Sequence, residues 1–163
     1  MADIKLDKKF VQTKIFMPDT PSQIDKGNFT LTIPKDWESN VDDEILTIIK
    51  SDNGVGAIQV SFYSIGPDIQ FDLFDEFHEL ITETLNIPLG KNWAKDVKQL
   101  RDNFLVFETV NQIDSRFFIA GLCAHNKSIL FLTYNCSIED KNIEYKDVYS
   151  FLQNIRFKNT ADT

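Results

Sequence analysis

Alternation of apolar and polar residues is clearest at residues 29–33, where Phe29, Leu31 and Ile33 alternate with two threonines before Pro34. Successive side chains of a strand point to opposite faces, so this pattern predicts a half-buried strand. Apolar-rich runs separated by turn residues predict further strands at 45–50, 57–65, 97–100, 104–110, 116–124 and 128–136. The sequence Asp52-Asn53-Gly54 between the first two of these runs is typical of a hairpin turn and not of a phosphate-binding loop.

Two other segments carry their apolar residues at helical spacing. Residues 73–85 form the first, with Phe77 at the centre of the apolar face, and Asp68 or Asp72 is expected to cap its start. The second contains Val148, Phe151, Leu152 and Ile155, which recur at i, i+3, i+4 and i+7. We expect this second helix to begin near residue 142.

The pair of strands at 116–124 and 128–136 has a register that the sequence predicts. If Asn126-Lys127 is a two-residue turn, His125 lies opposite Ser128 and residue 117 lies opposite residue 136. Both faces of this pair are then apolar, so we expect the two strands to be covered on both sides.

The same register separates the two cysteines. Cys123 pairs with Leu130, six positions away from Cys136. Six strand residues span roughly 20 Å, which is far beyond the reach of a disulfide. Two free thiols are typical of a reducing compartment, and we expect a cytoplasmic protein.

The order of these elements, β-β-β-α-β-β-β-β-α, predicts an α+β layered sandwich with a mainly antiparallel sheet and two main helices. Residues 28–158 are expected to form one domain, and residues 159–163 a tail. Residues 1–27 are expected to be an N-terminal extension, in which 10–17 form a possible extra strand and the following residues to Gly27 form a loop.

The segment Phe29-Thr30-Leu31-Thr32-Ile33-Pro34-Lys35-Asp36-Trp37, with the late Ile155-Arg156-Phe157 after the second helix, resembles the Mog1/PsbP-like superfamily. Within it, the chain looks most like small uncharacterised bacterial domain families. The resemblance implies the sandwich fold and a role in binding, since the superfamily includes photosystem-associated subunits, Ran-binding import factors and chaperones of secreted bacterial effectors. No functional residue of these branches carries over to this sequence.

The charge of the chain restricts the partners that it can bind. Asp and Glu outnumber Lys and Arg by 25 to 17, which gives a formal net charge of −8. Such a surface repels phosphate backbones, so we expect no nucleic-acid partner. The N-terminus lacks the apolar region of a signal peptide, and no apolar run approaches the roughly 18 residues of a membrane span.

Two tryptophans and an acidic run are the candidate binding residues. Trp37 and Trp93 fall in predicted loops, and the acidic run after Trp37 contains Glu38, Asp42, Asp43 and Glu44. Tryptophan is enriched at binding hot spots, and carboxylates attract a basic partner. The alternative for each is structural: a tryptophan that anchors a loop on the core, and a solvated acidic loop.

Candidate catalytic and metal-binding residues are few. His78 lies near Asp75 and Glu79 on the first helix, where the three could bind a metal ion. The same acidic residues are also typical of a solvent-exposed helix face. Cys123 and His125 are two residues apart on one strand, which is too far for a nucleophile and its base. We therefore predict no catalytic residue, no metal and no cofactor.

Three functions remain open on this reasoning. The first is a non-catalytic protein-binding module of adaptor or chaperone type, whose partner is another protein and possibly a basic one. The second is an inhibitor or immunity-type protein, which the small size and acidity also suit. The third is an enzyme whose site is assembled from scattered residues.

Overall fold

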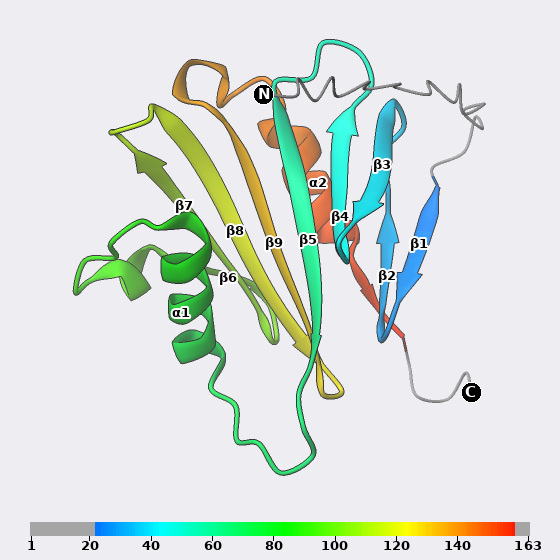
Figure 1. Ribbon diagram of the computed structural model, residues 1–163, viewed down its shortest axis with the longest axis vertical. Coiled ribbons are helices and arrows are strands. Elements are labelled where there is room, and N and C mark those ends of the chain that lie inside the picture. The colour runs from blue at the N-terminus through cyan, green and yellow to red at the C-terminus, as the bar shows by residue number, and fades with distance from the viewer. Residues whose placement is uncertain (1–21, 159–163) are drawn as a thin grey trace, which may run out of the picture.

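The computed structural model describes residues 22–158. The predicted strand at 10–17 and the predicted tail at 159–163 lie outside the described residues. Figure 1 shows the elements, in this order: β1 Gln23–Lys26, β2 Phe29–Thr32, β3 Trp37–Asp42, β4 Ile45–Lys50, β5 Gly56–Ser64, α1 Leu73–Leu85, β6 Lys98–Arg101, β7 Phe104–Asn111, β8 Arg116–His125, β9 Ser128–Ser137, α2 Tyr145–Asn154 and β10 Arg156–Phe157. Short 3-10 helices lie at Trp93–Asp96 and Ile138–Asp140.

The strands of the described chain form two antiparallel sheets. The large sheet has the order β3-β4-β5-β9-β8-β7-β6, so β3 and β6 are its edges. The small sheet has the order β1-β2-β10, and it brings the end of the described chain against its beginning. The predicted α+β class with a mainly antiparallel sheet and two helices is confirmed.

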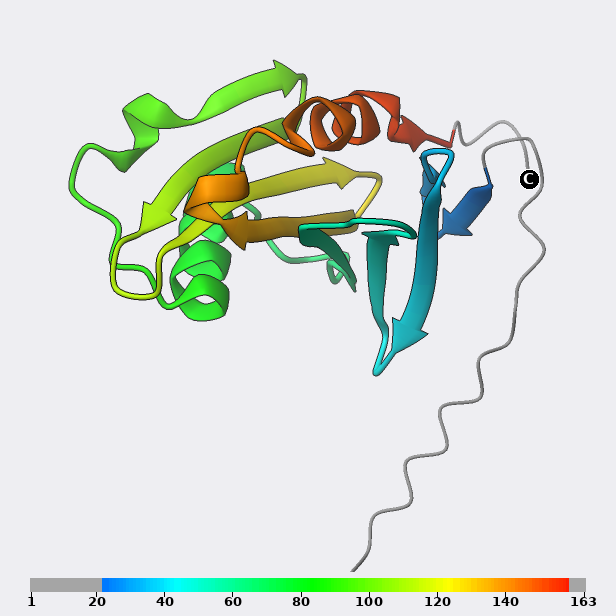
Figure 2. The same ribbon diagram turned by 90° about the horizontal axis from the view of Figure 1, so that it is seen from above.

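The centre of the large sheet is covered on both faces, as the sequence predicts (Figure 2). On one face, α2 contributes Val148, Phe151 and Leu152 to an apolar cluster that includes Leu130 and Leu132 of β9. We call this the α2 side. On the other face, the α1 side, Phe77 and Ile81 of α1 pack with neighbours from β7, β8 and β9.

The predicted register of β8 and β9 is confirmed. His125 pairs with Ser128, Cys123 pairs with Leu130, and Phe117 pairs with Cys136. Both cysteines are free and buried. The predicted cap of α1 is also present, since the Asp72 carboxylate accepts a hydrogen bond from the Asp75 amide at 2.9 Å.

Some elements differ from the prediction. Residues 23–26 form β1 in place of the end of a loop, because they pair with β2 around Gly27, whose φ is +54°. Only one apolar residue occurs in this strand, so no alternation reveals it. Helix α2 begins at Tyr145 and not near residue 142, because Ile138–Asp140 first forms a 3-10 turn.

Residues 37–42 form strand β3, and their assignment to a loop is wrong. The strand exists because it pairs with β4 over its whole length, from Trp37 opposite Lys50 to Asp42 opposite Ile45. Every residue of β3 after Trp37 is exposed. The sequence of this strand therefore lacks the alternation of apolar and polar residues that marks a half-buried strand.

Candidate functional site

The exposed acidic residues of the candidate site lie together on the hairpin formed by β3 and β4. We call residues 37–50 the acidic hairpin. It carries four carboxylates, those of Glu38, Asp42, Asp43 and Glu44, and all four residues are exposed. Within residues 22–158 none of the four forms an ion pair. The structure therefore brings the acidic run together on one edge of the sheet.

The turn of the acidic hairpin has two central residues. Asp43 and Glu44 have φ angles of 45° and 66°, so both adopt the left-handed conformation. Two left-handed residues between paired strands are typical of a type I′ hairpin turn, whose twist matches that of the strands. Both residues of the turn are exposed.

One face of the acidic hairpin combines charge with apolar surface. Residues directly opposite in an antiparallel pair share a face, and Glu38 lies opposite Ile49 while Asp42 lies opposite Ile45. The two isoleucines are 44% and 39% exposed, unusually open for large apolar side chains. This face therefore presents two solvent-accessible isoleucines, each beside a carboxylate, and we call it the outer face.

Trp37 lies beneath this surface and not on it. Its side chain is only 5% exposed and belongs to the apolar cluster on the α2 side. The assignment of Trp37 to a loop is wrong, since it is the first residue of β3. The ring anchors the hairpin to the core, which is the structural alternative that the sequence left open.

Trp93 lies on the opposite side of the sheet. It begins a 3-10 helix and packs against Phe77 and Phe107, with ring centroids 6.0 and 5.8 Å away. These partners belong to the α1-side cluster. The structure therefore does not bring Trp37 and Trp93 into one site, and the predicted loop around Trp93 is a short helix.

His78 is exposed on α1, where its ring contacts the edge of Trp93 at a centroid distance of 5.3 Å. A shallow depression of about 450 Å³ beside it is lined by Asp75, Glu79, Thr82 and Glu83. No group of three or more His, Cys, Asp or Glu residues in the described part of the chain is arranged to hold a metal ion.

Cys123 and His125 have separate partners. Cys123 is fully buried, and burial raises the pKa of its thiol to about 12 against the opposing effect of Arg101. The ring of His125 stacks on Phe157 at 4.6 Å, and its Nε2 lies 3.2 Å from the carbonyl of Lys158. A thiol with a raised pKa is a weak nucleophile, which agrees with a structural role.

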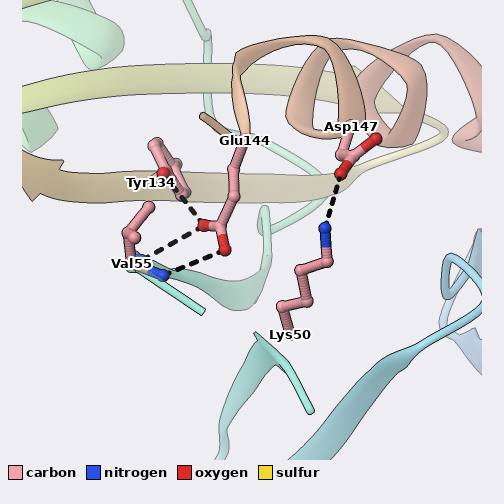
Figure 3. A network of polar contacts seen from close by, with 6 residues as sticks. Lys50, Val55, Tyr134, Glu144 and Asp147 are labelled. Atoms are coloured by element: carbon pink, nitrogen blue, oxygen red, sulfur yellow. Dashed lines mark hydrogen bonds and ion pairs between the residues drawn. The ribbon is translucent and has the colours of Figure 1, made fainter. Parts of the chain in front are cut away.

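A buried carboxylate joins the start of α2 to the start of β5, and sequence reasoning missed it. Glu144 is fully buried just before α2. Its carboxylate accepts hydrogen bonds from the amides of Val55 and Gly56 at 3.0 and 3.1 Å and from the Tyr134 hydroxyl at 3.0 Å. Figure 3 shows Glu144 between Val55 and Tyr134. Position 56 requires glycine, since a Cβ there would lie 2.5 Å from the ring of Tyr134.

An ion pair links the acidic hairpin to α2. Lys50, the last residue of β4, lies 3.5 Å from the Asp147 carboxylate (Figure 3). The buried Glu144 and this pair together connect the start of α2 with β4 and the start of β5. The only advance signal for Glu144 was an acidic residue in the first turn of a predicted helix, and that signal does not reveal burial.

A second polar cluster, also missed, joins α2 to the other end of the sheet. One oxygen of Glu108 accepts hydrogen bonds from Tyr145, Tyr149 and Lys98, at 2.7 Å for Tyr145 and 2.9 Å for Lys98. Burial acts to raise the pKa of Glu108, but the three hydrogen bonds and the Lys98 charge outweigh it and lower the pKa. Sequence separation hides this cluster, because its members come from β6, β7 and α2.

Within residues 22–158, no helix is long and apolar enough to cross a membrane. No protein-family model matches the chain, and a search of curated proteins finds no match.

Solved structures do resemble the chain. The cyanobacterial PsbP protein CyanoP from Synechocystis sp. PCC 6803 is 8% identical, with a TM-score of 0.59 over 85% of this chain and 92% of that one. The Ran-binding protein Mog1p from Saccharomyces cerevisiae is 10% identical, with a TM-score of 0.55 over 90% and 98%. A protein from Bacteroides thetaiotaomicron is 8% identical, with a TM-score of 0.54 over 83% of this chain, which spans about half (47%) of its length.

These likenesses lie at low sequence identity, so they concern the arrangement of elements and not the function. The chain has the Mog1/PsbP-like fold.

Proposed function

We propose that this protein is a non-catalytic protein-binding module whose basic partner binds at the acidic hairpin. The observation that carries the proposal is the outer face, where Glu38 and Asp42 lie beside the exposed side chains of Ile49 and Ile45. Carboxylates steer a basic partner during the encounter, and the apolar side chains supply area that is removed from water once the partner is bound.

The position of the acidic hairpin supports the proposal. β3 is an edge strand, and Val41 on it is 53% exposed. The hairpin is anchored to the core by Trp37 and is joined to α2 by the Lys50–Asp147 ion pair. A rigid support under an exposed surface reduces the entropy lost on binding.

The fold is compatible with binding. One structure with this fold is that of a Ran-binding protein, so the fold can carry a surface that another protein recognises. That likeness is 10% identical, so it shows the fold alone. The proposed site is the acidic hairpin, which Trp37 supports from the core, whereas Trp93 lies on the other side of the sheet.

Affinity capture with a charge-neutral variant tests the proposal. The variant Asp42→Asn, Asp43→Asn, Glu44→Gln removes three negative charges from the acidic hairpin. A matched control removes three from exposed residues elsewhere: Glu79→Gln, Glu83→Gln, Asp114→Asn. Quantitative mass spectrometry should find a protein that the wild type and the control retain and that the hairpin variant loses at least about tenfold, the factor that corresponds to 1.4 kcal/mol.

Thermal melting of all three proteins must accompany the capture, so that loss of the fold is distinguished from loss of the partner. If the hairpin variant is folded and retains every protein that the control retains, the acidic hairpin is not the binding site and the proposal fails.

A further inference from the structure

The edge of the large sheet at β3 is open in the described part of the chain. Within residues 22–158, β3 pairs only with β4, and the register of the two strands has no bulge. The strand contains no proline and no lysine, two residues that commonly protect a sheet edge from added strands. The opposite edge, β6, is shorter, and its register is interrupted between Gln99 and Arg101. β3 is therefore the edge that is best suited to accept another strand.

The turn of the acidic hairpin decides which backbone groups of β3 face the open side. The first and last residues of such a turn bond to each other, and in an antiparallel pair this bonding recurs at every second residue. Counting back from Asp42, the amides and carbonyls of Val41 and Ser39 therefore point away from β4. The Trp37 amide agrees with this alternation, because it donates to the Pro34 carbonyl at 3.2 Å.

The side chains along this edge form two different rows. Glu38 and Asp42 lie on the outer face, whereas Ser39 and Val41 lie on the other face. Val41 lies opposite Leu46, which is buried in the apolar cluster on the α2 side, yet Val41 itself is 53% exposed. A strand added at this edge covers Val41 with one of its faces and meets both carboxylates with the other.

We propose that the basic partner binds by adding an antiparallel strand to the free edge of β3, with basic residues on the outer face and apolar residues on the α2 side. The proposal rests on the proposed function, since it names how the partner engages the acidic hairpin. Backbone hydrogen bonds to Ser39 and Val41 supply affinity, and alternate side chains supply specificity. Opposite charges on directly facing residues stabilise a pair of strands.

Charge selects this occupant over a second copy of the chain. Two β3 strands would bring together edges that each carry Glu38 and Asp42, beside turns that each carry Asp43 and Glu44. Like charges that face each other across a strand pair destabilise it, and each chain has a formal net charge of −8. A strand with basic residues at alternate positions meets the same carboxylates with attraction.

Isothermal titration calorimetry of the full chain with a synthetic strand tests the inference. The probe is a capped peptide of the length of β3, in which lysine alternates with valine. One control peptide has N-methylated valines, which removes the amides that pair with Ser39 and Val41 and keeps every side chain. A second control has the same composition with its lysines grouped at one end. The full chain should bind the alternating peptide at least about tenfold more tightly than either control.

Two variants that add the same positive charge test where the strand binds. Val41→Lys places a lysine on the open edge, where this residue keeps added strands away. Ile113→Lys places one on the turn between β7 and β8, where Ile113 is 98% exposed. The first variant should lose at least about tenfold in affinity for the alternating peptide, and the second should bind as the wild type does. Equal affinities in these two variants, both shown by thermal melting to be folded, overturn the inference.

The outcomes separate this inference from the proposed function. Equal affinity for the alternating and N-methylated peptides, or no binding of the alternating peptide, overturns strand addition. Affinity capture with the charge-neutral variant tests the acidic hairpin without assuming an added strand. The proposed function can therefore hold when strand addition fails.

Amide exchange locates the bound strand. In the free full chain, the amides of Ser39 and Val41 should exchange faster than those of Asn40 and Asp42, which bond to β4. The alternating peptide should slow exchange at Ser39 and Val41 by at least about tenfold and leave β9 unchanged. Protection of Ser39 and Val41 in the free chain would show that the edge is already occupied, and it would overturn the inference.

Discussion

Glu144 shows what one side chain does for the fold, and it gives the first prediction. Its carboxylate satisfies the amides of Val55 and Gly56 and the hydroxyl of Tyr134 in a fully buried position. Glu144→Ala leaves these three donors without a partner, and each buried unsatisfied group costs about 1–3 kcal/mol. We expect a loss of at least about 3 kcal/mol in the free energy of unfolding, measured by chemical denaturation.

Glu139→Ala is the matched control for this prediction. Glu139 is exposed on the neighbouring 3-10 turn, so its replacement should change the free energy of unfolding by less than about 0.5 kcal/mol. Losses of similar size in the two variants would show that Glu144 does not have the structural role assigned to it.

Glu108 gives a prediction that depends on pH. Its pKa is lowered in the folded protein, so its contribution to stability is complete above its ordinary pKa of 4.5 and is lost as the pH falls through the lower folded value. At pH 7, Glu108→Gln should cost about 1.5–3 kcal/mol, the range of a hydrogen bond to a charged group.

The difference in unfolding free energy between wild type and Glu108→Gln should narrow as the pH is lowered from 6 to about 3, because the wild-type carboxylate then takes up a proton. Denaturation curves at a series of pH values measure it. A gap that is constant over this range would mean that the charge of Glu108 contributes nothing.

The apolar face of α1 is the first feature at the scale of elements. Phe77 is fully buried under this helix, whereas Phe74, one turn earlier, is 43% exposed. Phe77→Ala should therefore reduce the free energy of unfolding by about 3–5 kcal/mol, the range for removing a buried aromatic ring. Phe74→Ala, which removes the same atoms, should cost much less; comparable losses would place the wrong face of α1 on the sheet.

The turn between β8 and β9 gives a prediction of increased stability. Asn126 and Lys127 have φ angles of 46° and 63°, a region that glycine adopts without the steric cost of a side chain. Lys127→Gly should raise the free energy of unfolding by about 0.5–1 kcal/mol, the usual gain at such positions. Lys127→Ala loses the same charge and keeps the steric cost, so a gain of equal size in that variant would contradict the explanation.

The elements that the sequence predicted share one physical property: they are half-buried or buried with a regular period. β8, β9 and α1 have this pattern, and even the register of the strand pair followed from the two-residue turn. β1 and β3 have none, because their residues are mostly exposed and the strands exist through backbone pairing. A strand that is held only by backbone hydrogen bonds, with its side chains exposed, shows no hydrophobic periodicity in the sequence.

The candidate site could be predicted in part, for a related reason. The acidic run was visible because charges adjacent in sequence stay adjacent in a hairpin. The placement of Trp37 and Trp93 was not, because the faces on which they lie depend on the whole sheet. The Glu144 and Glu108 clusters each join residues from different elements, so only the folded chain assembles them.

At the scale of the whole molecule, the covered part of the sheet and the exposed acidic hairpin lie apart. The centre of the sheet is covered by α1 on one face and by α2 on the other (Figure 2), whereas the acidic hairpin at one edge carries exposed charge and exposed isoleucines. A chain with a formal net charge of −8 that gathers carboxylates on one edge should attract basic proteins from a distance.

The salt dependence of association tests this account most directly. For a partner obtained by affinity capture, the association rate constant of the wild type and of the Glu79→Gln, Glu83→Gln, Asp114→Asn control should fall steeply as ionic strength rises. The Asp42→Asn, Asp43→Asn, Glu44→Gln variant should associate more slowly at low salt, by about tenfold, with a flatter dependence. Identical rates and identical salt dependence in the folded hairpin variant and the wild type would contradict the acidic hairpin as the binding surface.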